Sequence, residues 1–314
     1  MSEEVISFSV VIPLYNKEST VERSIRSVLR QSVQDFEIIV VNDGSTDNGT
    51  LIVESIKDSR IRLIHQANQG VSAARNRGII EAKHEFIAFL DADDEWLPEF
   101  LKRIRRMVDR FPECDLYATR YYFDSSSRRR SAIVRGLPDD FEGIIGNYFN
   151  IALNSNPPVW SSATCVRKSV LAKIGGFPVG VKSGEDLLTW ARIASRYPVA
   201  YSMDCLSVFY QSPSEFSEGR PTRVPAHDNI VGNGLAELQN IVDKDARPFL
   251  CRYCALWHKM RASCYLRLDM RSEARHEIVK ALHYDVRLIL IIYLILSFLP
   301  SSIIRKAFSF GSSN

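Results

Sequence analysis

The sequence lacks the signatures of several common ligand-binding classes. It contains no G-x-G-x-x-G stretch, and GSTDNGT (Gly44 to Thr50) has the glycine spacing of a phosphate loop without its lysine. Neither a dinucleotide-binding fold nor a P-loop NTPase is therefore supported. Cys251 and Cys254 form a C-x-x-C pair, but no second cysteine or histidine pair completes a zinc site. We expect these thiols to serve packing.

The net charge of the chain is also small. The chain has 40 Lys and Arg against 37 Asp and Glu, a formal net charge of +3 that is too small to indicate nucleic-acid binding. Cys251 to Lys306 carries ten basic and four acidic residues, which leaves a net charge of −3 for the remainder. The acidic N-terminus MSEEVISF lacks the basic start of a signal peptide. We expect a cytoplasmic, mildly acidic body with a basic C-terminal piece.

No apolar run reaches the ~20 residues that a spanning helix needs. The longest, Leu288 to Leu299, is bracketed by Arg287, Arg305 and Lys306. Such a segment can lie at a membrane interface, pack into a core, or span with its flanks. We expect the interfacial state, which would place the protein peripherally on the inner face of the cytoplasmic membrane.

Buried strands and amphipathic helices alternate through the first third of the chain. FSVVIPLYN, from Phe8, is a continuous apolar run, as a strand buried on both faces requires. Three further strands are predicted from Phe36, Ile61 and Glu85. The helical patterns lie between them and after them, in STVERSIRSVLRQ, GVSAARNRGIIEAKH and LPEFLKRIRRMVDRF. The first is expected to start with a capping box of Ser19 and Glu22. This alternation predicts an α/β fold with a mainly parallel sheet. SSSRRRS (Ser125 to Ser131) is expected to be a solvated loop.

Polar clusters follow three of the predicted strands. They are Tyr15 to Glu18, Asn42 to Ser45, and Asp91 to Asp94. Ligands of such sheets bind beyond the carboxyl ends of the strands, so we expect all three clusters to line one crevice. The carboxylates of the last cluster suit Mg²⁺ or Mn²⁺, which commonly bridges a few carboxylates to substrate phosphates. The alternative is a solvated acidic turn that caps the following helix.

An ordered set of motifs resembles the family 2 glycosyltransferases with the GT-A fold. The resemblance covers about Phe8 to Tyr210 and is carried by FSVVIPLYNKESTVERSIRSVLRQS, FEIIVVNDGSTD, NQGVSAARNRGI, FIAFLDADDEWLP, SSATCVRKSVLAKIGGFP and GEDLLTWARIA. It implies a GT-A domain over 1–210, with a donor half (about 8–120) and an acceptor half (about 121–210). Residues 211–229 are expected to form a mobile loop, and 230–314 a helical C-terminal extension.

The resemblance also assigns roles to residues. The donor nucleotide-sugar is expected at Pro13, Tyr15, Asn16, Glu18, Asp43, Arg75, Asp91, Ala92 and Asp93. Asp91 and Asp93 match the DxD pair that holds the divalent cation, with Asp93 the more direct ligand. Arg75 could instead form a surface ion pair. Asp186 matches the catalytic base, and the adjacent Glu185 stays an alternative. His227 is a further candidate metal ligand.

The implied reaction is metal-dependent transfer of a sugar, with inversion, to a growing glycan or a lipid-linked acceptor. The Gly175-Gly176-Phe177 loop and Trp160 are expected near the acceptor, although Trp160 could belong to the core. Two other functions stay open. One is a metal-dependent sugar nucleotidyltransferase, and the other is an inactive nucleotide-sugar-binding module.

Overall fold

The computed structural model describes residues 6–125, 128–211, 216–217, 220–221 and 224–309. The chain divides into two compact units, Met1–Gln211 and Ser212–Asn314. The expected mobile loop at 211–229 falls partly outside the described residues.

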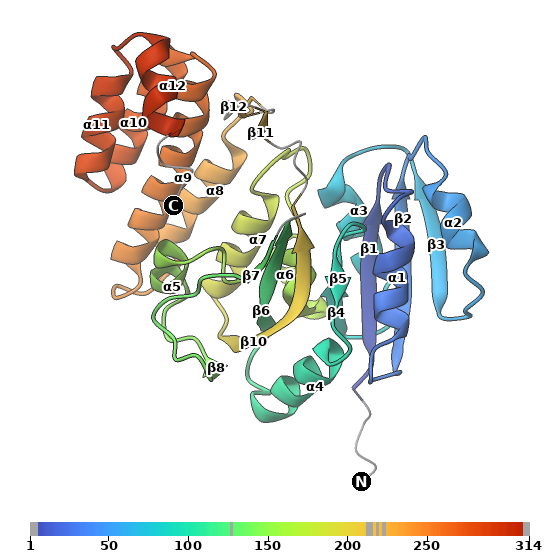
Figure 1. The fold of residues 1–314 in the computed structure, drawn as a ribbon. Coiled ribbons are helices and arrows are strands. Elements are labelled where there is room, and N and C mark those ends of the chain that lie inside the picture. The colour runs from blue at the N-terminus through green and yellow to red at the C-terminus, as the bar shows by residue number, and fades with distance from the viewer. Residues whose placement is uncertain (1–5, 126–127, 212–215, 218–219, 222–223, 310–314) are drawn as a thin grey trace. The chain divides into compact units, whose positions relative to one another are not determined.

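The first unit is built on one mixed sheet (Figure 1). Its strand order is β3-β2-β1-β4-β9-β6-β10-β5, with β7 added to β6 and β8 added to β10. The strands are β1 (Phe8–Leu14), β2 (Phe36–Asp43), β3 (Ile61–Gln66), β4 (Phe86–Phe89), β5 (Glu95–Trp96), β6 (Leu116–Ser125), β7 (Arg128–Ser131), β8 (Glu142–Ile144), β9 (Thr164–Arg167) and β10 (Val199–Tyr210).

Helices flank this sheet. They are α1 (Val21–Leu29), α2 (Gly49–Ser55), α3 (Val71–Glu81), α4 (Phe100–Arg110), α5 (Tyr148–Asn154), the 3₁₀ turn η1 (Ser161–Ala163), α6 (Lys168–Lys173) and α7 (Glu185–Ala194). Three of them, α1, α3 and α4, lie within the segments that the sequence patterns predict, whereas α2 was not predicted.

The alternation of side chains along β1 places α1 and α3 on opposite faces of the sheet. Val10 and Ile12 pack in the same buried cluster as Ile25 of α1. Val11 points the other way, toward Gly78 of α3, where a Cβ would approach the Val11 Cγ1 atom to 2.3 Å. Glycine at 78 therefore lets α3 lie close against β1.

The strand direction changes halfway across the sheet. Strands β3, β2, β1 and β4 are parallel, as the alternating pattern predicts. Strand β9 is antiparallel to both β4 and β6, while β6 and β10 are again parallel. The fold class is therefore α/β with a parallel first half, and the insertion of β9 carries residues 160–163 to the end of β4.

Two local expectations are wrong. Helix α1 begins after Thr20 with no side-chain cap, because Glu22 forms an ion pair of 2.6 Å with Arg26 instead of reaching back to Ser19. The predicted loop at Ser125 to Ser131 is partly strand β7, which pairs antiparallel with β6. All four β7 residues are exposed, so this strand is solvated, and its charges suit an edge strand.

The second unit is mainly helical. Its elements are β11 (Phe216–Ser217), β12 (Arg220–Pro221), α8 (Ile230–Glu237), the 3₁₀ turn η3 (Leu238–Asn240), α9 (Arg247–Arg267), α10 (Arg271–Tyr284), α11 (Leu288–Leu296) and α12 (Ser301–Ser309). Leu290 of α11 packs with Ala255 and Ala281, and Ile304 of α12 packs with Tyr265. Within the described residues, no helix combines the length and apolarity that crossing a membrane requires.

Candidate functional site

The end of β1 is bonded to the loop that follows β2. Asn16 adopts a left-handed conformation (φ 49°), which asparagine tolerates better than most residues. Its Oδ1 accepts a hydrogen bond from the Thr46 amide at 2.8 Å, and Glu18 Oε2 accepts one from the Asn48 amide at 2.9 Å. The Asn16 amide also donates to Ser45 Oγ at 3.2 Å, so the first predicted cluster is hydrogen-bonded to the second and to the residues that follow it.

Asp43, at the end of β2, is 3 % exposed and holds the entry to α3. Its Oδ1 accepts from Gln66 Nε2 and the Gln69 amide at 2.8 and 2.9 Å, and its Oδ2 accepts from the Gly70 amide at 2.8 Å. Because a carboxylate oxygen has two lone pairs, Oδ2 can accept one further hydrogen bond.

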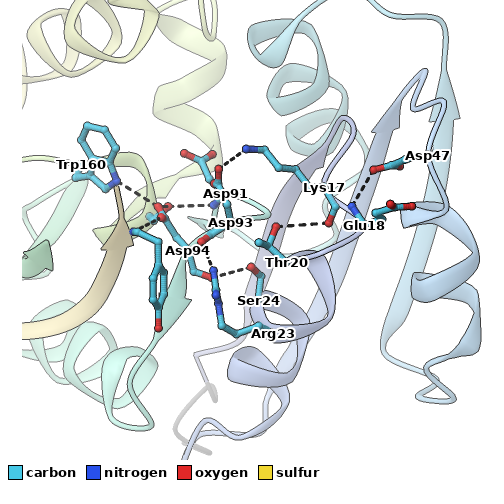
Figure 2. Close-up of polar contacts among 12 residues, drawn as sticks. Lys17, Glu18, Thr20, Arg23, Ser24, Asp47, Asp91, Asp93, Asp94 and Trp160 are labelled. Carbon is cyan, nitrogen blue, oxygen red and sulfur yellow. Dashed lines mark hydrogen bonds and ion pairs between the residues drawn. The ribbon is translucent and has the colours of Figure 1, made fainter. Parts of the chain in front are cut away.

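The third cluster meets the first through Lys17. The Lys17 ammonium forms an ion pair with the Asp93 carboxylate (Figure 2). On the same turn, Arg23 Nη2 donates to the main-chain oxygen of Asp93 at 2.5 Å. The ends of β1, β2 and β4 thus lie together, as the sequence predicts. The sequence analysis assigns no role to Lys17. The signal that could have found it is that Lys17 is the one basic residue in the three polar clusters, which also contain several carboxylates.

The four carboxylates of the DADDE stretch have different surroundings. Glu95 faces away on β5, where it accepts from the Tyr210 hydroxyl at 2.8 Å. Asp94 is 1 % exposed and accepts from Ser162 Oγ at 2.5 Å and from Trp160 Nε1 at 3.4 Å. The solvated helix-capping turn is therefore not what forms here. Burial, reinforced by Asp91 and Asp93, raises the pKa of Asp94 well above its ordinary value.

Trp160 belongs to an aromatic cluster. Its ring stacks on Tyr121 with centroids 5.8 Å apart and lies 4.7 Å from Phe209. Of the two roles open from the sequence, packing is therefore the one that these contacts describe, with the indole N–H directed at Asp94 (Figure 2).

Arg75 is the cation at the centre of the site. It is 3 % exposed, so the surface ion pair considered from the sequence is wrong. Its guanidinium donates to Asp91 Oδ1 at 2.7 Å and to Glu185 Oε1 at 3.1 Å. One side chain from α3 thereby connects the DxD turn to the start of α7.

The Gly-Gly-Phe loop supports this arginine. Gly175 and Gly176 both have positive φ (79° and 67°), a tight conformation that non-glycine residues rarely adopt. The loop brings Phe177 into contact with Asn76, which bonds both its N–H and C=O at 2.8 Å. The Phe177 ring centroid lies 5.1 Å from the Arg75 guanidinium carbon. The loop therefore forms the tight turn expected from the sequence and positions a ring beside Arg75.

Asp186 and Glu185 open α7 after Gly184, which has a φ of 84°. The Glu185 carboxylate is paired with Arg75, whereas Asp186 Oδ1 accepts a hydrogen bond from the Leu187 amide at 2.8 Å. Burial, with the charge of Glu185, raises the pKa of Asp186 to about 7 although Arg75 opposes the shift. A carboxyl that gains and loses a proton near neutral pH suits a general base.

Carboxyls outnumber the cations around this site. Burial raises the pKa of Asp91 despite its pair with Arg75, because Asp93 and Glu185 add negative charge. No set of three His, Cys, Asp or Glu side chains among the described residues could hold a metal ion. Mg²⁺ and Mn²⁺ need fewer protein ligands when substrate phosphates complete the shell. Asp91 and Asp93, with carboxylates that are 22 % and 33 % exposed, therefore fit such a cation.

Sequence reasoning missed Ser162 as well as Lys17. The hydrogen bond from Ser162 to Asp94 joins residues that are 68 positions apart in the chain, and no local sequence pattern predicts such a pair. The candidate metal ligand His227 belongs to the second unit and is exposed. Its role stays a prediction.

Comparison with known proteins gives consistent matches. The family model described as glycosyl transferase family 2 matches residues 9–175. The chain is 42 % identical over 123 residues to the uncharacterized glycosyltransferase EpsJ of Bacillus subtilis, covering 38 % of this chain and 36 % of that protein. It is 34 % identical over 186 residues to the uncharacterized glycosyltransferase alr2836 of Nostoc, covering 55 % of this chain and 54 % of that protein. The matched segments thus span only part of these relatives.

Among solved structures, S. aureus TarS residues 1–349 in complex with UDP-GlcNAc has a TM-score of 0.72 at 17 % identity. The match covers 98 % of this chain and 92 % of that one. At this identity the likeness concerns the fold, and it confirms the GT-A arrangement with C-terminal helices.

Proposed function

Because this chain belongs to the glycosyl transferase family 2, we propose that it transfers a sugar from a nucleotide-sugar to a growing glycan or a lipid-linked acceptor, with inversion at the anomeric carbon. The observation that carries the proposal is the Arg75 bridge between Asp91 and Glu185, which sets the DxD turn beside the first turn of α7. Family membership also leaves the nucleotidyltransferase alternative without support.

Asp186 is the proposed general base. The acceptor hydroxyl attacks the anomeric carbon while the bond from that carbon to the diphosphate oxygen breaks. The bonding pair leaves with the nucleoside diphosphate, and the hydroxyl proton passes to Asp186. Glu185 is a poorer base because its carboxylate is already paired with Arg75. We assign it to positioning Arg75.

The donor is proposed to bind across the ends of β1, β2 and β4, where Asn16, Glu18 and Asp43 are held by the network described above. Asp93 and Asp91 would hold Mn²⁺ or Mg²⁺. The cation supplies positive charge for the leaving diphosphate. Lys17 adds a positive charge beside Asp93. The fold neighbour TarS was crystallised with UDP-GlcNAc, which makes UDP-sugars the first donors to examine.

Donor hydrolysis and transfer, measured with and without Mn²⁺ across a panel of nucleotide-sugars, test this proposal. A ligand present at 100 times its Kd should also raise stability by about 2.7 kcal/mol in the presence of the metal. Metal-dependent stabilisation without turnover of donor, with any acceptor offered, would favour the inactive binding module.

We also propose that α11 binds the anionic cytosolic face of a membrane, where lipid-linked acceptors would be met. Leu288, Ile295 and Phe298 are 72, 57 and 66 % exposed, a concentration of apolar surface that calls for a partner. Arg287 precedes the helix with a side chain that is 45 % exposed. The surrounding piece carries a net +6, and each basic residue near an anionic leaflet contributes about 1 kcal/mol.

Vesicle sedimentation of point variants tests this surface. Deleting α11 and α12 would remove Leu290 and Ile304 and so uncover the buried surfaces of α9 and α10 on which they pack, so substitutions are preferable. L288S, I295S and F298S together should abolish sedimentation with anionic vesicles and leave donor hydrolysis unchanged. The matched control L51S with I80S removes residues that are 61 and 72 % exposed in the first unit. Equal sedimentation of both variants would contradict the proposal.

A further inference from the structure

Asp94 is a buried carboxyl whose partners come from segments far apart in the chain. Its Oδ2 accepts from Trp160 Nε1 (Figure 2) and from Ser162 Oγ, and its Oδ1 lies 3.4 Å from the Tyr210 amide. A carboxyl removed from water is costly unless such partners satisfy it. The proposed reaction gives Asp94 no direct part, so its burial needs another explanation.

Ser162 joins Asp94 to the main chain of Asp91. The Ser162 hydroxyl donates its one proton to Asp94 and accepts a hydrogen bond from the Asp91 amide at 3.0 Å. The amide of Asp94 in turn donates to the carbonyl of Asp91 at 3.0 Å. Both main-chain polar groups of Asp91 are therefore bonded to this pair of residues.

Ser162 is itself held in place. Its carbonyl accepts a 2.7 Å hydrogen bond from Trp96 Nε1, and Trp96 stacks on Phe100 of α4 with ring centroids 4.3 Å apart. The hydroxyl that reaches Asp91 is thus anchored to the core of the first unit.

The opposite side of the same turn is anchored to α1. Ser24 Oγ donates to the carbonyl of Asp94 at 2.7 Å, and Arg23 bonds the carbonyl of Asp93 (Figure 2). The turn is thereby fixed between α1 and the segment at 160–162. The amides and carbonyls of Asp91 and Asp94 and the carbonyl of Asp93 are all hydrogen-bonded. The Asp93 carboxylate is left partly exposed beside Lys17.

We propose that Asp94 and Ser162 are positioning residues that fix how Asp91 and Asp93 are presented to the metal–diphosphate group of the donor. This inference rests on the proposed function. Residues that orient metal ligands commonly contribute 10- to 100-fold to metal affinity. Without the Ser162 hydroxyl, the turn would keep its anchor on α1 and lose the bond that sets the Asp91 peptide.

The test is calorimetric binding of UDP at fixed Mn²⁺ and without metal. S162A should weaken Mn²⁺-dependent binding by about 10- to 100-fold and leave metal-free binding unchanged. D94A should do the same. The double variant should lose no more than the single ones, because the two residues act as a unit.

Ser161 provides a matched control. It is 2 % exposed, and its hydroxyl has no hydrogen-bond partner among the described residues. S161A therefore removes a buried hydroxyl from the adjacent position and should leave UDP binding unchanged. If S162A does not fold, D94N replaces it, since the remaining amide oxygen still accepts from Ser162 and a smaller loss is expected.

The outcomes separate this inference from the proposed function. If D93N leaves Mn²⁺-dependent UDP binding intact, the proposed metal role is wrong. If D93N abolishes that binding and both S162A and D94A retain it, the positioning role is overturned while the proposed function stands. Equal weakening with and without Mn²⁺ would also overturn it, because the pair would then merely support the fold.

Discussion

The two units of the chain each bury a cluster of charged residues, but the two clusters balance their charges differently. In the first unit, Arg75 faces both Asp91 and Glu185, and the pKa of Asp91 stays raised because burial and its acidic neighbours outweigh the arginine. In the second, Glu277 accepts from His258 at 2.6 Å and pairs with Arg261 at 3.0 Å. Burial would raise the pKa of Glu277, yet these two partners outweigh it and the pKa is lowered.

The difference separates a structural cluster from a functional one. The second cluster holds the chain before α8, since Arg261 donates to the carbonyl of Ala226 and the Tyr265 hydroxyl to that of Pro225, at 2.8 and 3.0 Å. Its charges are satisfied within the protein. The first cluster keeps a surplus of negative charge. Carboxyl groups with shifted pKa values of this kind are common at functional sites. Substitutions that break each cluster can sharpen this contrast.

The largest effect is expected at Asp93. D93N should abolish metal-dependent donor binding, because it removes the most exposed carboxylate of the DxD pair, while D91N should cause a smaller loss. Calorimetry with a nucleotide-sugar and Mn²⁺ measures both. The control is E277Q, which changes a buried carboxyl of the other cluster and should leave donor affinity unchanged. Unchanged affinity in D93N would remove the metal role.

D186N should come next. It should keep donor affinity and lower kcat by at least about 10²-fold, the range for a lost general base. In the wild type, kcat/KM should rise with pH through about 7, where Asp186 loses its proton, and the variant should lack this rise. A greater loss of kcat in E185Q would move the base to the neighbouring residue.

The sequence predicts well that the ends of β1, β2 and β4 lie together, because the determinants are local. Continuous apolar runs mark β1 and β2, and parallel strands bring their polar ends to one edge, so the meeting of Asn16, Asp43 and Asp93 follows from the pattern. The family resemblance supplied the expectations for Arg75 and Asp186, which local patterns alone would have left as surface or helix-end charges.

The remaining features depend on contacts that the sequence pattern does not reveal. Asp94 meets Ser162 only because β9 inserts antiparallel between β4 and β6. The capping box at Ser19 failed because the competing ion pair from Glu22 to Arg26 is one turn away on the same helix. The strand β7 escaped notice because three consecutive arginines carry no alternation of apolar residues.

The two arginines offer a paired test of stability. R75M leaves Asp91 and Glu185 without their cation and should lower the free energy of unfolding by about 3–5 kcal/mol. R261M should cost less, because His258 still donates to Glu277. Denaturant unfolding measures both. Saturating Mn²⁺ should recover part of the loss in R75M and none in R261M. If Mn²⁺ restored stability equally in the two variants, or in neither, the inference that the first cluster carries surplus negative charge would be contradicted.

The smallest expected effect is a difference in the direction of pH dependence. Asp186 has a folded pKa of about 7 against an ordinary value of 3.8, so the folded state binds its proton more tightly. The stability from this group is complete below pH 3.8 and is lost as pH rises toward 7. Glu277 has a folded pKa below its ordinary 4.5, so its contribution is present above pH 4.5 and is lost on acidification.

Thermal unfolding without metal measures both effects. The stability of the wild type should decline between pH 4 and 7, a decline that D186N removes, and should also fall on the acid side, a loss that E277Q removes. If both substitutions altered the same side of the pH profile, the two clusters would not differ in charge balance, and the contrast between a site prepared for a cation and a closed structural network would fail.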